Sequence, residues 1–329
     1  MRKGGAQDRF LAALLGMSIG DALGMPVAGW SAATIVERFG AIDGYHRRVF
    51  ADGAEIKAGE FTDESEIAFC IVESATVNDG VIDAENIAAR MRMLARGESK
   101  RWMGAATLAA LNESEDEFGS MVALDEDGPA TCDVAPRGIP IGLLHGVGRF
   151  DLDRLKADAE SVTRITHGSP VAISAVTAVA LGVQLAVRGE QPKDRWPGTV
   201  AEILGHGSVA EALGSVPAFS AGGDVAGGIA RCGLTEDGAE TVAGAFLAAT
   251  AAGGFVEGVL AAVNAGGATD SRAAIAGALL GTANGAAAIP QPLIDDLEGR
   301  IYASLAAPWF YRSALRRAGL VISMRPEQA

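Results

Sequence analysis

The sequence predicts an all-α fold, and three observations lead to that expectation. Apolar residues recur at helical spacing along nearly the whole chain, and no convincing strand alternation interrupts them. Aromatic residues make up only 5% of the 329 residues and β-branched runs are short, so the residue types that favour strands are scarce. Alanine and glycine line the apolar segments, which lets helices approach closely. We therefore expect a single all-α domain over residues 1–329 with buried central helices.

The expected helices follow one another from the N-terminus to the C-terminus. They span residues 9–19, 32–39, 67–76, 84–94, 103–111, 152–165, 171–186, 240–252, 256–263, 273–280 and 294–305. Gly40 directly follows the second segment and is a typical C-terminal glycine. Residues 191–207 contain two prolines and several glycines, so we expect a loop there. No repeat of fixed period and no long linker divides the chain.

The charge of the chain limits its partners. Its 27 basic and 41 acidic residues give a net charge of −14. This argues against nucleic acid as a main partner, because binding to a phosphate backbone needs a basic face. Residues 113–127 hold seven of the acids and no lysine or arginine. That segment is either a solvated loop or a lid that covers substrate and donates a carboxylate.

The cysteines and the apolar segments bear on location. The three cysteines lie far apart and show no metal-ligand spacing, so reduced thiols and a cytoplasmic protein are expected. Residues 10–20 resemble a signal peptide only loosely, because two charged residues interrupt the approach, and we expect them to form the first helix. Residues 273–294 carry no charge but contain glycines and prolines, so we expect no membrane span.

Two stretches place glycine, hydroxyl and carboxylate residues directly before an apolar run. The first is Gly59-Glu60-Phe61-Thr62-Asp63-Glu64-Ser65-Glu66, and the second is Gly266-Gly267-Ala268-Thr269-Asp270-Ser271. Asp63 followed by Glu66 fits a helix N-cap with a glutamate three residues later. Hydroxyl and carboxylate oxygens are also the ligands that Mg²⁺ and Ca²⁺ prefer, and two such helix starts would supply one metal centre from opposite ends of the chain. The residues alone leave both interpretations open.

Four further motifs accompany these two stretches. They are Gly20-Asp21-Ala22-Leu23-Gly24-Met25-Pro26-Val27, Arg137-Gly138-Ile139-Pro140-Ile141-Gly142, Thr166-His167 with Pro170, and Ile289-Pro290. With all six in this order over residues 8–302, the chain resembles the ADP-ribosylglycohydrolase family, which includes the dinitrogenase-reductase-activating glycohydrolase. The resemblance implies an orthogonal all-α helical bundle and a hydrolase that uses Mg²⁺.

The resemblance also implies roles for individual residues. The implied metal ligands are Thr62, Asp63, Glu64, Asp270 and Ser271. The candidate catalytic acids are Asp63 and Glu64. The residues expected at the substrate are Asp21, Trp102, Thr131, Cys132, Asp133, His167 and Gly267. Simpler roles compete with these: Asp63 and Asp270 would cap helices. Asp21 would accept hydrogen bonds beneath the site, and His167 would bond to its own turn.

Departures from the family's motifs are as informative as the matches. Ala28 stands where the family carries a glutamate, and Ala268 stands where it carries an aspartate. Glu64 replaces an aspartate but keeps the charge. Trp102 occupies a position that is acidic in arginine-specific relatives, and residues 131–133 replace the Asn-Gly of a phosphate-contacting loop. Fewer carboxylates remain to neutralise two mutually repelling cations, so we expect one well-occupied Mg²⁺, and a second only when substrate phosphates help.

These observations lead to one functional hypothesis and one alternative. The leading hypothesis is a Mg²⁺-dependent hydrolase that cleaves an N- or O-ribosyl bond of an ADP-ribosyl or related ribosyl compound. Its partner would be a small molecule or an ADP-ribosylated substrate. The alternative is a divergent relative that binds ADP-ribose or a nucleotide without catalysis, because three expected acids are replaced by Ala28, Trp102 and Ala268.

Overall fold

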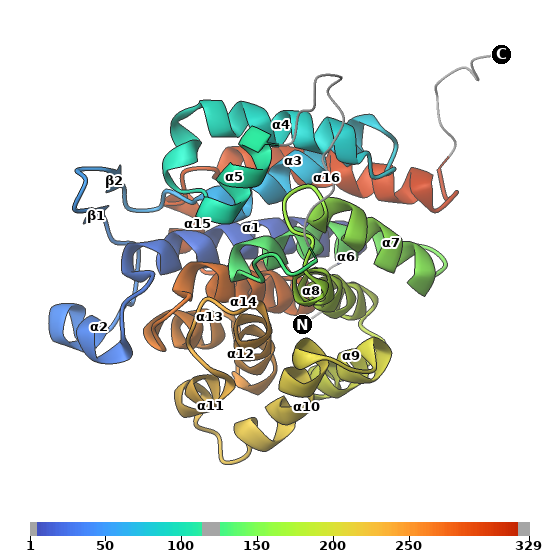
Figure 1. Ribbon diagram of the computed structural model, residues 1–329. Helices are drawn as coiled ribbons and strands as arrows, with labels where there is room; N and C mark the ends of the chain where they lie inside the picture. The colour runs from blue at the N-terminus through green and yellow to red at the C-terminus, as the bar shows by residue number, and fades with distance from the viewer. Residues whose placement is uncertain (1–4, 114–125, 322–329) are drawn as a thin grey trace.

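The computed structural model describes residues 5–113 and 126–321, and these residues form the predicted all-α assembly (Figure 1). The α-helices are α1 (Ala6–Gly24), α2 (Ala32–Phe39), α3 (Asp63–Val77), α4 (Ala84–Arg96), α5 (Ala105–Glu113), α6 (Gly138–His145), α7 (Leu152–Thr163), α8 (Pro170–Arg188), α9 (Trp196–Leu204), α10 (Ser208–Ser220), α11 (Val225–Cys232), α12 (Gly238–Ala251), α13 (Phe255–Asn264), α14 (Thr269–Asn284), α15 (Gln291–Asp295) and α16 (Arg300–Arg317). Short 3-10 helices are η1 (Met25–Val27), η2 (Glu98–Arg101), η3 (Cys132–Arg137), η4 (Lys193–Arg195) and η5 (Ala286–Ala288). The strands β1 (Arg48–Val49) and β2 (Glu55–Ile56) form one small antiparallel hairpin.

Helices α1 and α14 cross the middle of the molecule in direct backbone contact. Glycines recur every four residues on the α1 face that meets α14. A Cβ on Gly16, Gly20 or Gly24 would overlap the main chain of α14, and a Cβ on Gly277 would overlap the main chain of α1. Glycine is therefore required at these positions by close approach. This contact brings the N-terminal end of α14 beside the C-terminal end of α1, where the candidate site lies.

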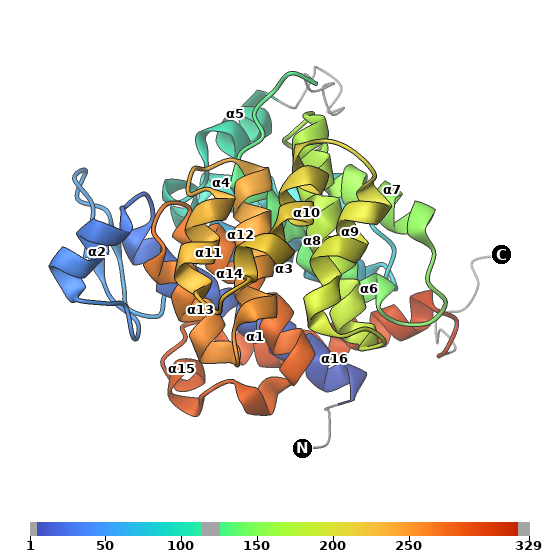
Figure 2. The ribbon, with the colours of Figure 1, turned by 90° about the horizontal axis from the view of Figure 1, so that it is seen from below.

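The remaining helices cover both sides of this central pair. In Figure 1, α3, α4 and α16 lie on one side of α1, while α12 and α13 lie on the other side, beyond α14. Figure 2 shows α8, α9, α10, α11 and α12 side by side on that second side. Helix α2 and the β-hairpin project at one end of the molecule in both views. The core is one continuous cluster of buried apolar side chains.

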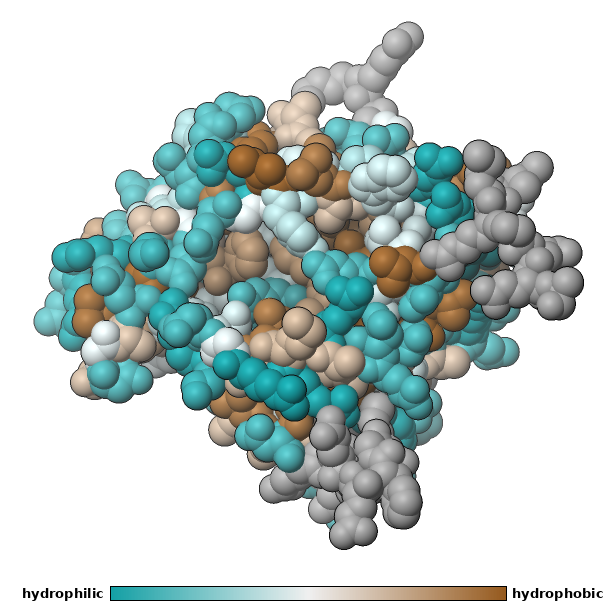
Figure 3. All heavy atoms as spheres, turned by 90° about the horizontal axis from the view of Figure 1, so that it is seen from above, coloured by the Kyte–Doolittle hydropathy of each residue, from teal (hydrophilic) through white to brown (hydrophobic). Residues whose placement is uncertain are grey.

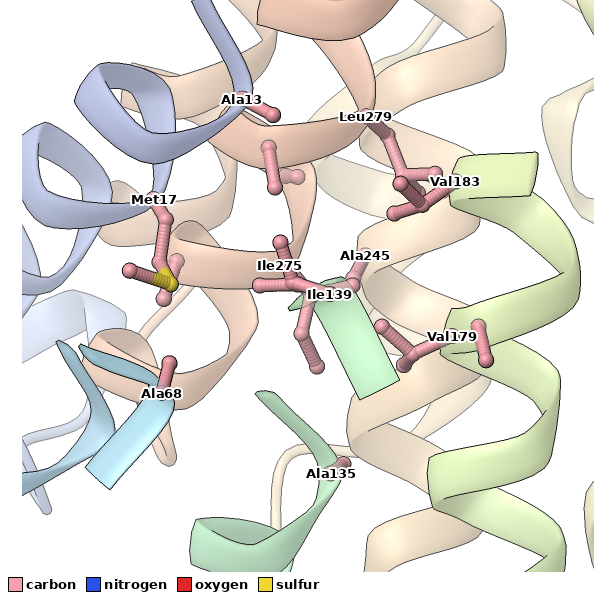
Figure 4. Close-up of a cluster of buried hydrophobic side chains, with 14 of the residues drawn as sticks. Ala13, Met17, Ala68, Ala135, Ile139, Val179, Val183, Ala245, Ile275 and Leu279 are labelled. Carbon is pink, nitrogen blue, oxygen red and sulfur yellow. The ribbon is translucent and has the colours of Figure 1, made fainter. Parts of the chain in front are cut away.

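The centre of the core joins helices from distant parts of the chain. Figure 4 shows Met17 of α1, Ile275 of α14 and Val179 of α8 around Ile139 of α6. All four are fully buried. Helix α6 reaches this position because Gly138 sits against the main chain of α8, where a Cβ would overlap. The Arg-x-x-Pro-Ile-Gly motif is therefore a buried helix start.

Two expectations about secondary structure were wrong. Residues 191–207 are mostly helical: Pro197 lies in the first turn of α9, where no backbone N–H is needed, and Trp196 and Val200 are buried. The single helix expected over 294–305 is two helices, with α15 ending at Asp295 and α16 continuing to Arg317. Glycine and proline, which usually signal loops, occupy helix starts and packing contacts here.

Two helical segments, Ala6–Val27 and Pro170–Arg188, are long and apolar enough to cross a membrane. Of the most apolar 18 residues in each segment, 89% and 72% are buried, which is typical of helices in a protein core.

The acidic segment, which we interpreted as either a solvated loop or a lid, falls mainly on residues 114–125, outside the described residues. The assignment of the chain to a single domain stays a prediction.

Candidate functional site

The candidate site is a cavity of about 340 Å³ between the starts of α3 and α14. It is lined by Ala28, Gly29, Asp63, Glu64, Trp102, Gly104, Ala105, Ala106, Thr131, Cys132, Asp133, Glu236, Ala268, Asp270 and Ser271. The two stretches singled out in the sequence, more than 200 residues apart, thus face one cavity. The packing of α1 against α14 places them there.

Asp21 fixes the start of α3 from beneath. Its Oδ1 accepts a hydrogen bond from the Thr62 hydroxyl (2.7 Å). Its Oδ2 accepts from the Thr62 N–H (3.0 Å), the Ser65 N–H (3.2 Å) and the Ser65 hydroxyl (2.7 Å). Asp21 is fully buried, and burial raises its pKa to about 6 although these hydrogen bonds act to lower it. It therefore caps α3 from another helix, as the simpler interpretation of Asp21 expected.

Asp63 does not cap α3, so the interpretation of Asp63 as an N-cap, which competed with that of a metal ligand, is wrong. The N-cap is Thr62, and Asp63 is the first helical residue. Its Oδ2 is buried and has no hydrogen-bond partner. Burial raises the pKa of Asp63 well above its usual range, and the charges of Asp133, Asp21 and Asp270 raise it further. An unpartnered carboxylate oxygen in this setting needs either a proton or a cation.

Glu64 connects the two helix starts. Its Oε2 lies 2.8 Å from the Thr62 hydroxyl, and its Oε1 accepts a hydrogen bond from the Ser271 hydroxyl at 2.8 Å. The Thr62 hydroxyl also faces Asp21, yet it carries one proton for two carboxyl groups. One of those groups must therefore be protonated or neutralised by a cation. Burial raises the pKa of Glu64 well above its usual range, and the charge of Asp63 adds to this.

The start of α14 is held through its main chain. Gly266 and Gly267 have φ angles of +80° and +76°, which favour glycine. The Gly267 N–H donates to the Trp30 carbonyl (2.8 Å), and the Thr269 hydroxyl donates to the Gly24 carbonyl (2.8 Å). Ala268 is the N-cap residue and offers no side-chain cap. Asp270 is thus the only carboxylate in this stretch, and burial raises its pKa.

The oxygen donors at these two helix starts fit a hard divalent cation. They comprise carboxylates and hydroxyls, the ligand types of Mg²⁺, and they include the unpartnered Oδ2 of Asp63. Burial is the main cause of the raised pKa values of Asp63, Glu64 and Asp270, and the charges of neighbouring carboxylates raise them further. Across residues 5–113 and 126–321, no three acidic, histidine or cysteine side chains already converge as a metal site. Binding would therefore draw these side chains together, with hydroxyls or waters completing the shell.

Asp133 lines the cavity from η3 and belongs to a network of hydrogen bonds. Asp133 Oδ2 accepts from the Thr107 hydroxyl (2.8 Å), which also receives a bond from Arg137 Nη2 (3.3 Å). Arg137 Nη1 donates to the Thr166 hydroxyl (2.6 Å), and that hydroxyl lies 2.8 Å from His167 Nδ1. Arg137 thus holds the Thr107 and Thr166 hydroxyls in place by hydrogen bonds.

This network keeps Asp133 ionised and His167 neutral. Burial opposes ionisation of Asp133, but His167, the Thr131 and Thr107 hydroxyls and Arg137 together hold its pKa below the usual range. Burial and the charge of Arg137 lower the pKa of His167 to about 4, so His167 is uncharged near neutral pH. At that pH the hydrogen bonds and Arg137, rather than His167, stabilise the Asp133 carboxylate.

The predicted substrate residues divide into two groups. Trp102, Thr131, Cys132 and Asp133 line the cavity. The others lie outside its lining: Asp21 and His167 are fully buried, and the glycine at position 267 supports the α14 start. The structure thus places the predicted contacts of Asp21 and His167 behind the cavity wall, and the simpler role of His167 fits its bonds to Thr166 and Thr131.

Sequence reasoning did not single out Glu236. It lines the cavity from the loop before α12, and its carbonyl accepts a hydrogen bond from the Cys132 N–H (2.9 Å). No local pattern marks Glu236, because its position depends on pairing with a distant segment.

The Cys132 thiol is not suited to act as a nucleophile. Burial raises its pKa above the usual range, and the charge of Asp270 raises it further, so the thiolate is disfavoured.

Comparison with known proteins decides the family. A family model described as ADP-ribosylglycohydrolase matches residues 2–321 of the chain. The chain belongs to the ADP-ribosylglycohydrolase family. The resemblance of the six motifs, and the fold it implied, are thereby confirmed.

Individual relatives agree with this membership of the ADP-ribosylglycohydrolase family. The chain is 30% identical over 312 residues to an uncharacterized protein of Archaeoglobus fulgidus, covering 94% of this chain and 98% of that one. It is 29% identical over 188 residues to the uncharacterized protein YegU of Escherichia coli, covering 56% and 55% of the two chains. A solved structure titled ADP-ribosylglycohydrolase-related protein complex matches with a TM-score of 0.74 and 26% identity, covering 94% and 99%.

Proposed function

We propose that this protein is a Mg²⁺-dependent hydrolase that cleaves an N- or O-ribosyl bond of an ADP-ribosyl or related ribosyl compound. The observation that carries the proposal is the buried, unpartnered Oδ2 of Asp63 in a cavity shared with Glu64 and Asp270. Such an oxygen is costly to bury unless a proton or a cation satisfies it. Family membership supports the choice of glycosidic chemistry.

The site residues would act as follows. The residues that would hold Mg²⁺ are Thr62, Asp63, Glu64, Asp270 and Ser271. If two Mg²⁺ ions bind, one would have a fuller set of protein ligands than the other. The cation would contribute Lewis acidity and orientation of ribose hydroxyls and water.

The protein's own groups would handle the proton and the developing charge. Asp63 or Glu64, whose pKa values are raised well above the usual range by burial, would assist the leaving group or the attacking water. The ionised Asp133, which also lines the cavity, would favour positive charge that develops at the anomeric carbon.

A second function has its own supporting observation. Ala28 and Ala268 both line the cavity at the two positions where the family motifs carry carboxylates. A site short of two acids would bind an ADP-ribosyl ligand yet turn it over poorly. A non-catalytic ADP-ribose-binding or nucleotide-binding protein is therefore the rival proposal.

One experiment separates the two. Purified protein is incubated with Mg²⁺ and a panel of ADP-ribosylated and simple ribosyl compounds, and release of the free sugar is followed by chromatography. We expect Mg²⁺-dependent turnover that EDTA abolishes and that Asp63→Asn reduces at least a hundredfold, as loss of a catalytic acid does. Tight binding of ADP-ribose without turnover on any compound would replace the hydrolase with the binding protein.

A further inference from the structure

A second cavity, of about 310 Å³, lies between α3, α4 and α16. None of its described lining residues also lines the candidate functional site. Figure 3 looks onto the side of the molecule that carries α4 and α16 in Figure 1, and hydrophobic residues are interspersed with hydrophilic ones there. The second cavity has the same mixed character, because its lining includes aromatic rings and carboxylates.

Three aromatic rings form one wall of the second cavity. Phe69 of α3 packs against Phe61 with the ring centres 5.9 Å apart, and against Tyr302 of α16 at 4.9 Å in an edge-to-face arrangement. All three residues belong to the lining. Such rings offer apolar surface to a ligand, and their faces attract a positive charge.

Glu66 places an unsatisfied carboxylate oxygen beside these rings. Its Oε1 accepts a hydrogen bond from the Ser99 hydroxyl (2.7 Å), whereas its Oε2 is buried and has no partner among the described residues. Burial raises the pKa of Glu66, and the hydrogen bond from Ser99 only partly offsets this. Arg101 also favours the ionised form, but its guanidinium forms an ion pair with Glu60 (2.9 Å). The Oε2 of Glu66 therefore needs a proton or a cation.

The other charged groups of the second cavity satisfy one another. Arg90 is the only basic residue of the described lining, and its Nη1 donates to Glu73 Oε2. The Tyr302 hydroxyl donates to Glu73 Oε1, so both oxygens of Glu73 have partners. The negative charge of Glu66 is thus the one that the lining leaves uncompensated.

An organic cation fits these surroundings better than a metal ion. Mg²⁺ and Ca²⁺ need several oxygen ligands, but the second cavity offers a single free carboxylate oxygen among aromatic and aliphatic side chains. An ammonium group needs fewer acceptors and gains from adjacent ring faces. The volume is at the low end for small-molecule sites, so the ligand is small.

We propose that the second cavity binds a small organic ammonium ion, whose N–H groups donate to Glu66 Oε2 and whose apolar body lies against Phe61, Phe69 and Tyr302. This ligand is distinct from the ribosyl substrate of the proposed function and binds at a different place. The residues that recognise it belong to α3, α16 and the loop before α3, so the site is present without any metal.

Binding of phenethylammonium tests the proposal. It is titrated in the presence of Mg²⁺, which competes for the carboxylates of the candidate functional site, and Kd is obtained by ligand-observed NMR. Glu66→Gln should raise Kd roughly tenfold or more, as expected for loss of a hydrogen bond to a charged group. The matched control Glu85→Gln, which neutralises an exposed acid on α4, should leave Kd unchanged.

Two comparisons test the contributions of the rings and of the positive charge. Tyr302→Leu should raise Kd about threefold, whereas Tyr302→Phe, which keeps the ring, should preserve binding. The neutral analogue 2-phenylethanol has nearly the same shape as phenethylammonium, and the wild-type protein should bind it roughly tenfold more weakly or less.

The outcomes are independent of any turnover of ribosyl compounds. Equal Kd values in Glu66→Gln and Glu85→Gln overturn the ammonium site, and so does equal affinity for phenethylammonium and 2-phenylethanol. Binding that Asp270→Ala abolishes and Glu66→Gln preserves places the amine in the candidate functional site instead. If Glu66→Gln lowers the Tm strongly, the comparison of the two ligands and the Tyr302 variants decide the question.

Discussion

The two helix starts that form the site are built from similar sequence and are held in opposite ways. The start of α3 is held by side chains: Asp21 accepts four hydrogen bonds from Thr62 and Ser65. The start of α14 is held by backbone, through glycines at positive φ and carbonyls of Trp30 and Gly24. The start of α3 therefore brings several buried acidic side chains together. The start of α14 is fixed by its backbone conformation and carries a single carboxylate.

This difference shows that two stretches with the same pattern of glycine, hydroxyl and acid need not contribute the same number of carboxylates to a metal site. The α3 start contributes Asp63 and Glu64, whereas the α14 start contributes Asp270 and has alanine at position 268. We therefore expect the α14 start to limit cation binding. The following predictions test that asymmetry, from the largest expected effect to the smallest.

Removing the last acid of the α14 start should have the largest effect. Asp270→Ala leaves that start without a carboxylate, so Mg²⁺ affinity should fall at least a hundredfold, to below detection by titration calorimetry. Glu202→Ala, which removes an exposed acid from α9, is the matched control and should bind Mg²⁺ like the wild type. Unchanged Mg²⁺ affinity in Asp270→Ala would place the cation elsewhere.

Restoring an acid should have the converse effect. Ala268 lines the cavity and is buried, so Ala268→Asp puts a carboxylate beside Asp270. Without metal, the variant should be less stable than the wild type, because like charges crowd one buried space. With Mg²⁺, its melting temperature should rise by more than that of the wild type.

The neutral variant Ala268→Asn separates charge from volume. It adds nearly the same side-chain volume as Ala268→Asp but no charge, so Mg²⁺ should raise its Tm no more than that of the wild type. If the aspartate and asparagine variants gain equally from Mg²⁺, a decayed metal site at the α14 start is ruled out.

The smallest expected effect is on stability as a function of pH. The folded-state pKa of Asp21 is about 6 against an ordinary value of 3.8, and the pKa values of Asp63, Glu64 and Asp270 are also raised. These four carboxyl groups therefore bind more protons in the folded protein than in the unfolded chain above about pH 4, and the stability that they contribute is lost as the pH rises. Two groups act in the opposite direction: Asp133, with its lowered pKa, below about pH 4, and His167, whose pKa of about 4 makes stability rise with pH up to about 6.5. The four carboxyl groups outnumber His167 in that range, so the net slope is set by them.

Thermal melts in EDTA measure this effect. The Tm should be a few degrees higher at about pH 5 than at about pH 7.5. Asp21→Asn should flatten this slope, because the substituted side chain no longer titrates. A metal-free Tm that increases between these pH values would contradict the assignment of the buried carboxyl groups.

Sequence reasoning succeeded where the information is local and failed where it depends on distant contacts. Helix α2 spans the predicted residues because its period and its terminal glycine lie within one short segment. The starts of α3 and α14 were recognisable for the same reason. Glu236 was not, because its place at the cavity depends on the bond between its carbonyl and the Cys132 N–H, which are far apart in the sequence. The N-cap at Asp63 was misplaced by one residue, since the cap of α3 is supplied largely by Asp21.

The contact between α1 and α14 limits how early the protein can fold during its synthesis. The hydrogen bond from Thr269 to Gly24 joins residues 245 positions apart. The central glycine contact therefore cannot form until most of the chain has left the ribosome, and closing so long a segment has a high entropic cost. Until then, the apolar and glycine-rich face of α1 lacks its partner. The nascent chain should thus be exposed to aggregation and to chaperones for longer than an ordinary all-α protein of its length.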